Sequence, residues 1–203
     1  MTSSDTALLF ADMEPANLRR LLNAALDAFA ARGYRATTTR DIAQHAGLSP
    51  AAVYIHFRSK ADLLSAISRS GHEAILRLSE QAIAEGADPT DRLHRFVCTF
   101  AAWHAEHHAV ARIIQYELRE LPPGAFEEIR ELRRSFDRIV QTELRQGNQA
   151  GLFEVNDIAG TALAILSLCI DVARWYTPTS PRSPAAIGEL YANLVLRMVR
   201  AAQ

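Results

Sequence analysis

The sequence predicts an all-α fold, and three observations support this prediction. Apolar residues recur at the three- and four-residue spacing of amphipathic helices through most of the 203-residue chain. No stretch of useful length alternates apolar and polar residues as a half-buried strand does. Glycine and proline gather at a few points that separate the helical patterns, namely 86–89, 122–124 and 177–184. We therefore expect a three-helix head, a long connecting helix and a larger helical body.

Composition narrows the class of protein. About half of the residues (49%) are apolar, which is enough to bury a sizeable core. The two cysteines, Cys98 and Cys169, lie far apart in apolar helical patterns, so they suggest buried hydrophobic side chains rather than a disulfide or a metal pair. The chain has no run of 18 uncharged apolar residues and no leader with a basic start. We expect a cytoplasmic protein that does not span a membrane.

The charges are unevenly distributed, although the formal net charge is only −1. Residues 13–62 carry seven Lys or Arg against four Asp or Glu, a net of +3. Residues 63–203 carry fifteen Arg against seventeen acidic residues, a net of −2. Because phosphate contacts depend on local cations, a mildly basic head on a mildly acidic body is compatible with a nucleic-acid partner.

The head follows a short arm. Residues 1–14 are small or polar without a sustained period, so they are predicted to be disordered. Pro15 opens an amphipathic helix, which Gly33 terminates. Thr39 is then expected to cap a second helix, and the chain turns sharply at Gly47.

Two further helix starts complete the head and begin the connection to the body. Ser49 can cap a short helix with Pro50 at its first position, and the preceding helix, the turn and this helix form a helix-turn-helix. Ser59 can cap the next helix, and Asp62 supplies its acidic first turn. That helix continues to the first glycine-proline break. The predicted divisions are the arm at 1–14, the helix-turn-helix head at 15–62 and the body at 63–203.

The residues from Thr38 to Leu64 carry a more specific signal than the helix-turn-helix alone. They read T-x-R-D-I-A-x-x-A-G-L-S-x-x-x-V-Y-x-H-F-x-S-K-x-D-L-L, which closely resembles the DNA-binding signature of the TetR family of bacterial transcriptional regulators. The alternative is that these are only the packing residues of a small helical bundle. The resemblance implies that the helix at 49–55 enters the major groove of a double-stranded DNA operator and that the body binds a small-molecule effector.

Roles in DNA binding are transferred position by position from that resemblance. Tyr54, His56 and Lys60 match family positions that clasp phosphates, and Thr39 matches a phosphate-contacting N-cap. Arg40 is the candidate for a bidentate contact to guanine, since its fork fits O6 and N7. The outer face of the short helix offers little hydrogen-bonding capacity, so readout there would depend on thymine methyls and DNA shape. The predicted DNA-binding residues are Thr38, Thr39, Arg40, Ser49, Ala51, Ala52, Tyr54, His56 and Lys60.

The body is predicted to begin with a helix capped by Thr90 and to end with two long apolar helices. The segment 157–176 is apolar almost all round, and 184–201 is amphipathic. Both helices could bury their apolar faces within their own body. In the TetR family the last two long helices form a four-helix bundle across a two-fold axis, so the resemblance implies a homodimer through 157–176 and 184–201.

Candidate effector contacts are polar or aromatic side chains at positions where a body helix is otherwise apolar. The tryptophans among them are more often core than pocket residues, and Arg174 is equally explained as an ion-pair partner of Asp171 or Glu189. The segments 103–104 and 172–176 resemble bodies of some regulators of lipid and acyl-CoA catabolism, which implies an acyl-CoA or fatty-acid-like effector whose anionic group meets Arg130 or Arg174. The candidates are Trp103, His104, His107, Tyr116, Arg130, Cys169, Arg174 and Trp175.

Metal-binding and catalytic alternatives have weaker support. His104 and His108 lie four apart, but zinc would need further ligands and no HExxH or nearby cysteine pair occurs. No G-x-S-x-G, phosphate-cradling glycine loop or recognisable pair of carboxylates is present. We therefore expect no metal, no cofactor and no enzymatic activity. A purely structural dimer would leave the Tyr-x-His-Phe-x-x-Lys spacing unexplained.

Overall fold

The computed structural model describes residue 10 and residues 15–200. The predicted disordered arm lies outside the described residues except for Phe10, whose side chain is fully buried. The described residues form helices and no β-strand, with one isolated antiparallel bridge between Phe153 and Arg200. The all-α prediction is confirmed.

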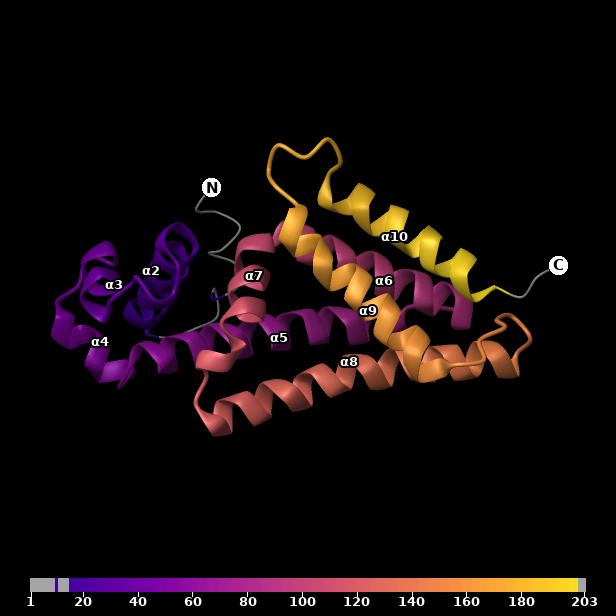
Figure 1. Cartoon of the computed structure of the whole chain (residues 1–203), viewed down its shortest axis with the longest axis horizontal. Helices are drawn as coiled ribbons and strands as arrows, with labels where there is room; N and C mark the ends of the chain where they lie inside the picture. The colour runs from indigo at the N-terminus through magenta and orange to yellow at the C-terminus, as the bar shows by residue number, and fades with distance from the viewer. Residues whose placement is uncertain (1–9, 11–14, 201–203) are drawn as a thin grey trace. The chain divides into compact units, whose positions relative to one another are not determined.

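The helices begin and end close to the points that the apolar periodicity and the glycine-proline breaks predict. In chain order (Figure 1) they are α2 (Ala16–Arg32), α3 (Thr39–His45), α4 (Pro50–His56), α5 (Lys60–Ala84), α6 (Pro89–Glu106), α7 (His108–Tyr116), the 3-10 helix η1 (Leu118–Glu120), α8 (Pro123–Gln149), α9 (Ile158–Trp175) and α10 (Pro184–Val199).

Two N-caps differ from the prediction. Thr38, rather than Thr39, caps α3: its hydroxyl accepts from the backbone N–H of Asp41 at 3.2 Å, and the Asp41 carboxylate accepts from the backbone N–H of Thr38 at 2.9 Å. This reciprocal capping box requires an acidic residue three positions after the cap, which Thr39 lacks. Asp88, rather than Thr90, caps α6, because a proline at the first helical position makes its predecessor the N-cap.

The chain divides into two compact units. The first contains the described residues up to His72 together with Ala109–Arg130, and the second contains Glu73–His108 with the described residues after Arg130. The helices α5 and α8 each contribute residues to both units. The sequence assigns 109–130 to the body, whereas by compactness this segment groups with the head, where Arg35 of the head pairs with Glu120 of η1 at 2.9 Å.

Within the first unit, α2, α3 and α4 pack around a small apolar core. Leu22 of α2, Ile42 of α3 and Val53 of α4 are each fully buried. The turn between α3 and α4 is closed by Gly47, whose φ of +65° lies in the left-handed region that favours glycine. Arg20 of α2 braces the same turn by donating to the backbone carbonyl of Ala46 at 2.6 Å. This packing fixes the direction of α4.

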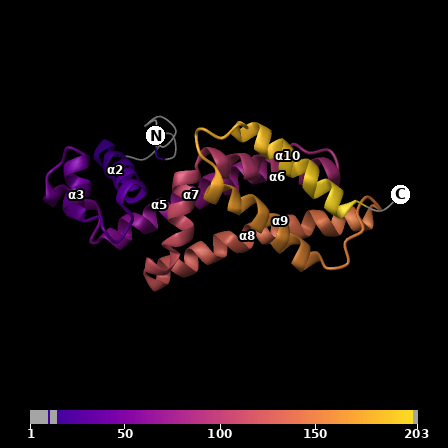
Figure 2. The same cartoon turned by 45° about the horizontal axis from the view of Figure 1, so that its top comes forward.

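Within the second unit, α9 and α10 both pack against α6, and both views show α10 running along α6 (Figures 1 and 2). The approach of α10 is close because Gly188 has no side chain: a Cβ there would collide with the backbone carbonyl of Cys98. Beside this contact, residues of α6, α9 and α10 and of the turn after α9 form an apolar cluster. Its buried members are Ala105, Val172, Tyr176 and Ile187.

The helix α9 is long and apolar enough to span a membrane by length and composition alone. Its mean hydropathy is 1.6, and only 28% of its residues are buried. Core helices of soluble proteins pass the same test, but such helices are mostly buried. The exposed face of α9 therefore requires a physical explanation of its own.

Candidate nucleic-acid interface and effector-binding residues

The short helix α4 presents a largely apolar outer face. Its inward side is formed by Val53 and then by Phe57, which directly follows the helix, and both are buried. On the outer side, Ile55 is 77% exposed and Tyr54 is 58% exposed, while Ala51 is also exposed. A seven-residue helix that leaves an isoleucine this exposed offers a surface for contact with another apolar group, such as a base methyl.

Two hydroxyl groups meet where α3 and α4 approach each other. The side-chain oxygens of Thr39 and Tyr54 lie 3.1 Å apart, and either one can donate to the other. Each hydroxyl can take part in more than one hydrogen bond, so the pair retains capacity for an external acceptor. The displaced cap at Thr38 leaves the side chain of Thr39 available for this contact. The first turn of α3 and the outer face of α4 thus form one surface.

Three further predicted DNA-binding residues border this surface. Arg40 is exposed and makes no hydrogen bond or ion pair with another residue of the described part of the chain. Ser49 is the N-cap residue of α4, yet its hydroxyl makes no capping bond and its side chain is exposed. His56 is half-buried at the last residue of α4. Arg40 and Ser49 therefore keep unused hydrogen-bonding groups.

Lys60 has different surroundings from those the resemblance implies. Its ammonium donates to the backbone carbonyls of Tyr34 at 2.7 Å and Thr37 at 2.9 Å, with that of Arg35 at 3.5 Å. It also lies 4.2 Å from the centroid of the Tyr34 ring, which is a cation–π contact. All three N–H groups of the ammonium are therefore directed at the loop between α2 and α3. Lys60 stabilises this loop from within the head.

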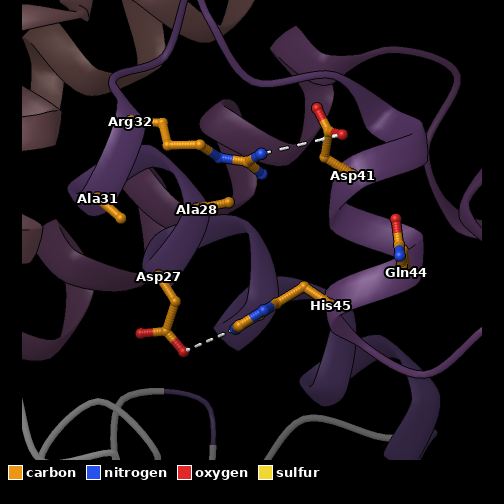
Figure 3. A pocket seen from close by; sticks show the side chains of 7 residues that line it. All are labelled: Asp27, Ala28, Ala31, Arg32, Asp41, Gln44 and His45. Carbon is orange, nitrogen blue, oxygen red and sulfur yellow. Dashed lines mark ion pairs between the residues drawn. The ribbon is translucent and has the colours of Figure 1, made fainter.

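A hollow of about 490 Å³ lies between α2 and α3 (Figure 3). Side chains from the two helices face each other across it: His45 approaches Asp27 at 3.6 Å, and Arg32 approaches Asp41 at 3.9 Å. Hydrogen bonds from Thr38 hold the pKa of the Asp41 carboxyl below its usual value. Because the basic side chains that line the hollow already face carboxylates of the chain itself, the surface around α4 is the better candidate for DNA.

In the second unit, three of the predicted effector residues lie together. Trp103 is buried, and its ring lies 5.2 Å from that of His104 and 4.9 Å from that of His107. His104 is also buried and packs against Phe100 at 4.6 Å, and Phe100 in turn contacts Phe136 of α8 at 5.0 Å. The aromatic side chains of α6 therefore form a continuous row that reaches α8.

The other predicted effector residues do not join this row. Cys169 is fully buried, and burial raises the pKa of its thiol to about 12. Arg174 is exposed and pairs with Asp171 at 2.7 Å, as the ion-pair interpretation of its sequence position predicts. Trp175 is 40% exposed.

In the first unit, Arg130 is exposed and pairs with Glu127 at 2.6 Å. Tyr116 is exposed and lines a cavity of about 220 Å³ with Phe29, Arg112 and others.

Sequence reasoning missed two polar groups in the second unit. Arg133 of α8 is half-buried, and burial lowers the pKa of its guanidinium. The hydroxyl of Ser79 in α5 is fully buried without a hydrogen-bond partner in the described part of the chain. The signal for Arg133 was present, since it follows Ile129 by four residues and precedes Phe136 by three, which places a cation in the apolar stripe of α8.

The histidines considered as metal ligands bond to the backbone of their own chain. A ring nitrogen of His104 lies 2.7 Å from the carbonyl of Phe100, and one of His108 lies 3.0 Å from that of Ala105. Within the described ranges, no group of three or more His, Cys, Asp or Glu side chains is arranged to hold a metal ion.

Large apolar side chains are exposed along both α9 and α10. On α10 they recur every four residues, which keeps them on one side of that helix. Their exposed fractions lie between 36% and 65%. The residues are Leu163, Leu168 and Trp175 on α9, and Leu190, Leu194 and Met198 on α10.

Two models of protein families match the chain. Residues 21–67 match the model described as bacterial regulatory proteins, tetR family. Residues 86–199 match the model described as Tetracyclin repressor-like, C-terminal domain. The first match covers the helix-turn-helix and the second covers most of the body.

Individual proteins resemble the chain over much of its length. The HTH-type transcriptional repressor KstR2 of Rhodococcus jostii (strain RHA1) is 33% identical over 179 residues, which is 87% of either protein. The fatty acid metabolism regulator protein of Bacillus subtilis (strain 168) is 25% identical over 132 residues, covering 65% of this chain and 68% of that protein. The crystal structure of a bacterial regulatory protein in the tetR family from Rhodococcus RHA1 is 42% identical, covers 93% of this chain and 100% of its own, and superimposes with a TM-score of 0.88.

Proposed function

Since the chain belongs to the TetR family of bacterial transcriptional regulators, we propose that it binds a palindromic operator as a homodimer and that a small, largely apolar effector releases it. It acts as a repressor in the cytoplasm and catalyses no reaction. Operator DNA, a second copy of the chain and the effector are its partners. No cofactor takes part.

The observation that best supports operator binding is the surface formed by the first turn of α3 and the outer face of α4. It offers the paired hydroxyls of Thr39 and Tyr54, the guanidinium of Arg40 and the uncapped hydroxyl of Ser49 beside an exposed Ile55. Hydroxyl groups position a protein on phosphates, while the arginine fork and the apolar face read base edges. Lys60 takes no part in this contact in our proposal, because its ammonium is held by the chain's own carbonyls.

The exposed apolar side chains of α9 and α10 support the homodimer. A monomer would leave Leu163, Leu194 and Met198 in water at 65%, 45% and 50% exposure, whereas a second copy would cover them. A two-fold axis lets the same surface serve both protomers, and it places two heads on half-sites about 34–36 Å apart or a multiple of this. The partner copy also explains why α9 is apolar enough to span a membrane and yet little buried.

The effector class is proposed from the interior of the body and from the relatives. The aromatic row of Phe100, Trp103, His104 and Phe136 is an apolar lining that would suit a largely apolar molecule. One relative is named a fatty acid metabolism regulator protein. A fatty acid or its coenzyme A thioester combines an apolar chain with an anionic group, and we propose this class for the effector.

The dimer and the operator can be tested together with the variant Leu163→Glu/Leu194→Glu. Like charges at the centre of the two-fold contact should make the protein monomeric and weaken operator binding by about 100-fold or more, since each half-site would be bound separately. The matched control is Leu78→Glu, which alters a leucine on α5 that is exposed to nearly the same degree as Leu194, 44% against 45%.

Sedimentation velocity would measure the assembly state, and gel-shift titration on an inverted repeat selected from random DNA by the wild-type protein would measure operator affinity. A double variant that stays dimeric, or a wild-type protein that selects no inverted repeat, would contradict the proposal.

A further inference from the structure

The first unit contains a small cavity whose lining comes from α2, from α7 and from the residue that follows α7. Its volume is about 220 Å³, below the roughly 300–1,000 Å³ that is usual for pockets of drug-sized ligands. Phe29 of α2 and Ile113 of α7 are buried, with exposed fractions of 2% and 7%, and Ala30 and Ala109 lie beside them in the lining. The inner wall is therefore apolar, and the space suits a small molecule with a hydrophobic part.

Side chains of opposite charge line the same cavity. Arg112 of α7 and Glu117, which directly follows that helix, are both half-buried. Among the residues that the structure describes, neither side chain makes a hydrogen bond or an ion pair, with the other or with a third residue. Their spacing of five explains why they do not pair, because side chains meet on a helix surface at spacings of three and four. Each charge is therefore available to a ligand.

A cavity with a cation, an anion and an apolar wall is complementary to a molecule that carries the same three features. A guanidinium binds a carboxylate through two parallel N–H···O bonds. The Glu117 carboxylate can accept hydrogen bonds from an ammonium group. An α-amino acid holds both charges on one carbon atom, and its side chain supplies the hydrophobic part. A fatty acid fits less well, since its carboxylate would meet Arg112 and be repelled by Glu117.

We propose that this cavity binds a free α-amino acid with a hydrophobic side chain of about the size of leucine. Arg112 binds its carboxylate, Glu117 binds its ammonium, and its side chain packs against Phe29 and Ile113. The cavity lies in the first unit, whereas the aromatic row proposed for the apolar effector lies in the second, so this ligand is an additional one. Phe29 belongs to α2, which packs against α3, and the amino acid therefore contacts the DNA-binding head directly.

The test is an NMR titration of the isotope-labelled full-length protein with three probes. They are L-leucine, 4-methylpentanoate, which lacks the ammonium, and 3-methylbutan-1-amine, which lacks the carboxylate. Arg112→Met and Glu117→Gln each remove one charge from the cavity, and Ala109→Leu fills it while keeping both charges, so the test stands if one variant does not fold. Arg119→Met is the matched control, since Arg119 is an exposed arginine of the same unit outside the lining. Circular dichroism verifies folding.

We expect the wild-type protein to bind L-leucine about 10-fold more tightly than either analogue, because each analogue leaves one charge of the cavity without a partner. Arg112→Met should remove the preference for leucine over the amine, and Glu117→Gln should remove its preference over the acid. Ala109→Leu should abolish the binding of all three probes. Arg119→Met should change no affinity by more than about two-fold.

Three results would overturn the inference. Wild-type protein whose spectrum is unchanged by millimolar L-leucine does not bind an amino acid. Leucine binding that is equal in the wild-type protein and in all the cavity variants would place the amino acid elsewhere. Equal affinity for leucine and 4-methylpentanoate would show that Glu117 takes no part and that the ligand class is wrong. None of these results bears on operator binding or on the apolar effector, which gel shifts and acyl-chain ligands test separately.

Discussion

Lys60 in the head and Arg133 in the body are both cations drawn partly out of water, and their surroundings differ. Lys60 donates to the carbonyls of Tyr34 and Thr37 and lies over the Tyr34 ring. Arg133 shares its helix face with Ile129 and Phe136. A cation bound by carbonyls of its own chain stabilises the fold. A cation that shares a helix face with apolar side chains is partly desolvated, and burial lowers the pKa of the Arg133 guanidinium.

Arg92 shows how the body holds a cation that serves its structure. Its guanidinium donates to Glu143 at 2.7 Å and to Gln146 at 2.6 Å, and the Glu143 side chain is only 6% exposed. The ion pair joins α6 to α8 within the second unit. Removing the buried carboxylate of Glu143 is the strongest test of how the body holds Arg92.

Glu143→Leu is expected to lower the free energy of unfolding by about 2–3 kcal/mol, because it leaves Arg92 desolvated without its anion. The double variant Arg92→Met/Glu143→Leu should recover most of this loss. Urea titration followed by circular dichroism measures both variants, with Glu128→Gln at the exposed pair with Arg69 as control. A Glu143→Leu loss no larger than that of Glu128→Gln would show that burial does not strengthen the dependence of Arg92 on its carboxylate.

Lys60→Met is expected to lower the free energy of unfolding by about 2 kcal/mol, since two short charged hydrogen bonds are lost and the carbonyls of Tyr34 and Thr37 lose their donor. Operator affinity should fall as the head loosens. The slope of log affinity against log salt should stay the same, because a lysine bound to carbonyls neutralises no phosphate.

Gel shifts at several salt concentrations measure the slope, and urea titration measures stability. A slope smaller by about 1 with unchanged stability would instead assign Lys60 to a phosphate, as the family resemblance implies.

Gly47→Ala is expected to lower the free energy of unfolding by about 1–2 kcal/mol, because its φ of +65° is unfavourable for a residue with a Cβ. A Cβ there would also lie 3.1 Å from the guanidinium of Arg20 that braces the turn. Gly124→Ala is the control, since no atom lies within 4 Å of its Cβ position and its φ is not positive. Equal thermal midpoints for both variants would show that the turn is not strained.

The helix-turn-helix could be predicted from the sequence because its determinants are local. The glycine turn, Pro50 at the start of α4 and the acidic first turn of α5 act within a few residues of one another. The N-cap of α3 was predicted one residue too late. Two adjacent threonines can cap the helix, and only Thr38 has an acidic residue, Asp41, three positions after it. The partners of Lys60 could not be predicted, since they lie 23 to 26 residues away in a loop whose position depends on the packing of α2.

The candidate effector site was harder to predict for a related reason. The segment after Pro123 contains many arginines and glutamates, and only the phase of α8 separates the inward Arg133 from its outward neighbours. The search for polar or aromatic side chains on otherwise apolar helices identified Trp103, His104 and His107, which do lie together. The same criterion also selected Arg174, whose salt bridge with Asp171 places it on the exposed side of α9.

A substitution in the hollow between α2 and α3 should have the smallest effect on stability of those predicted for the head. His45 and Asp27 approach at 3.6 Å, and their side chains are 56% and 39% exposed. Water screens such a pair, so His45→Gln should change the free energy of unfolding by less than about 0.5 kcal/mol. Operator affinity should also stay within about two-fold, because we assign no phosphate contact to the residues that line the hollow. Urea titration of His45→Gln and Lys60→Met measures the difference between their free energies of unfolding. A loss near that of Lys60→Met would mean that ion pairs between helices, rather than cations on carbonyls, hold the head together.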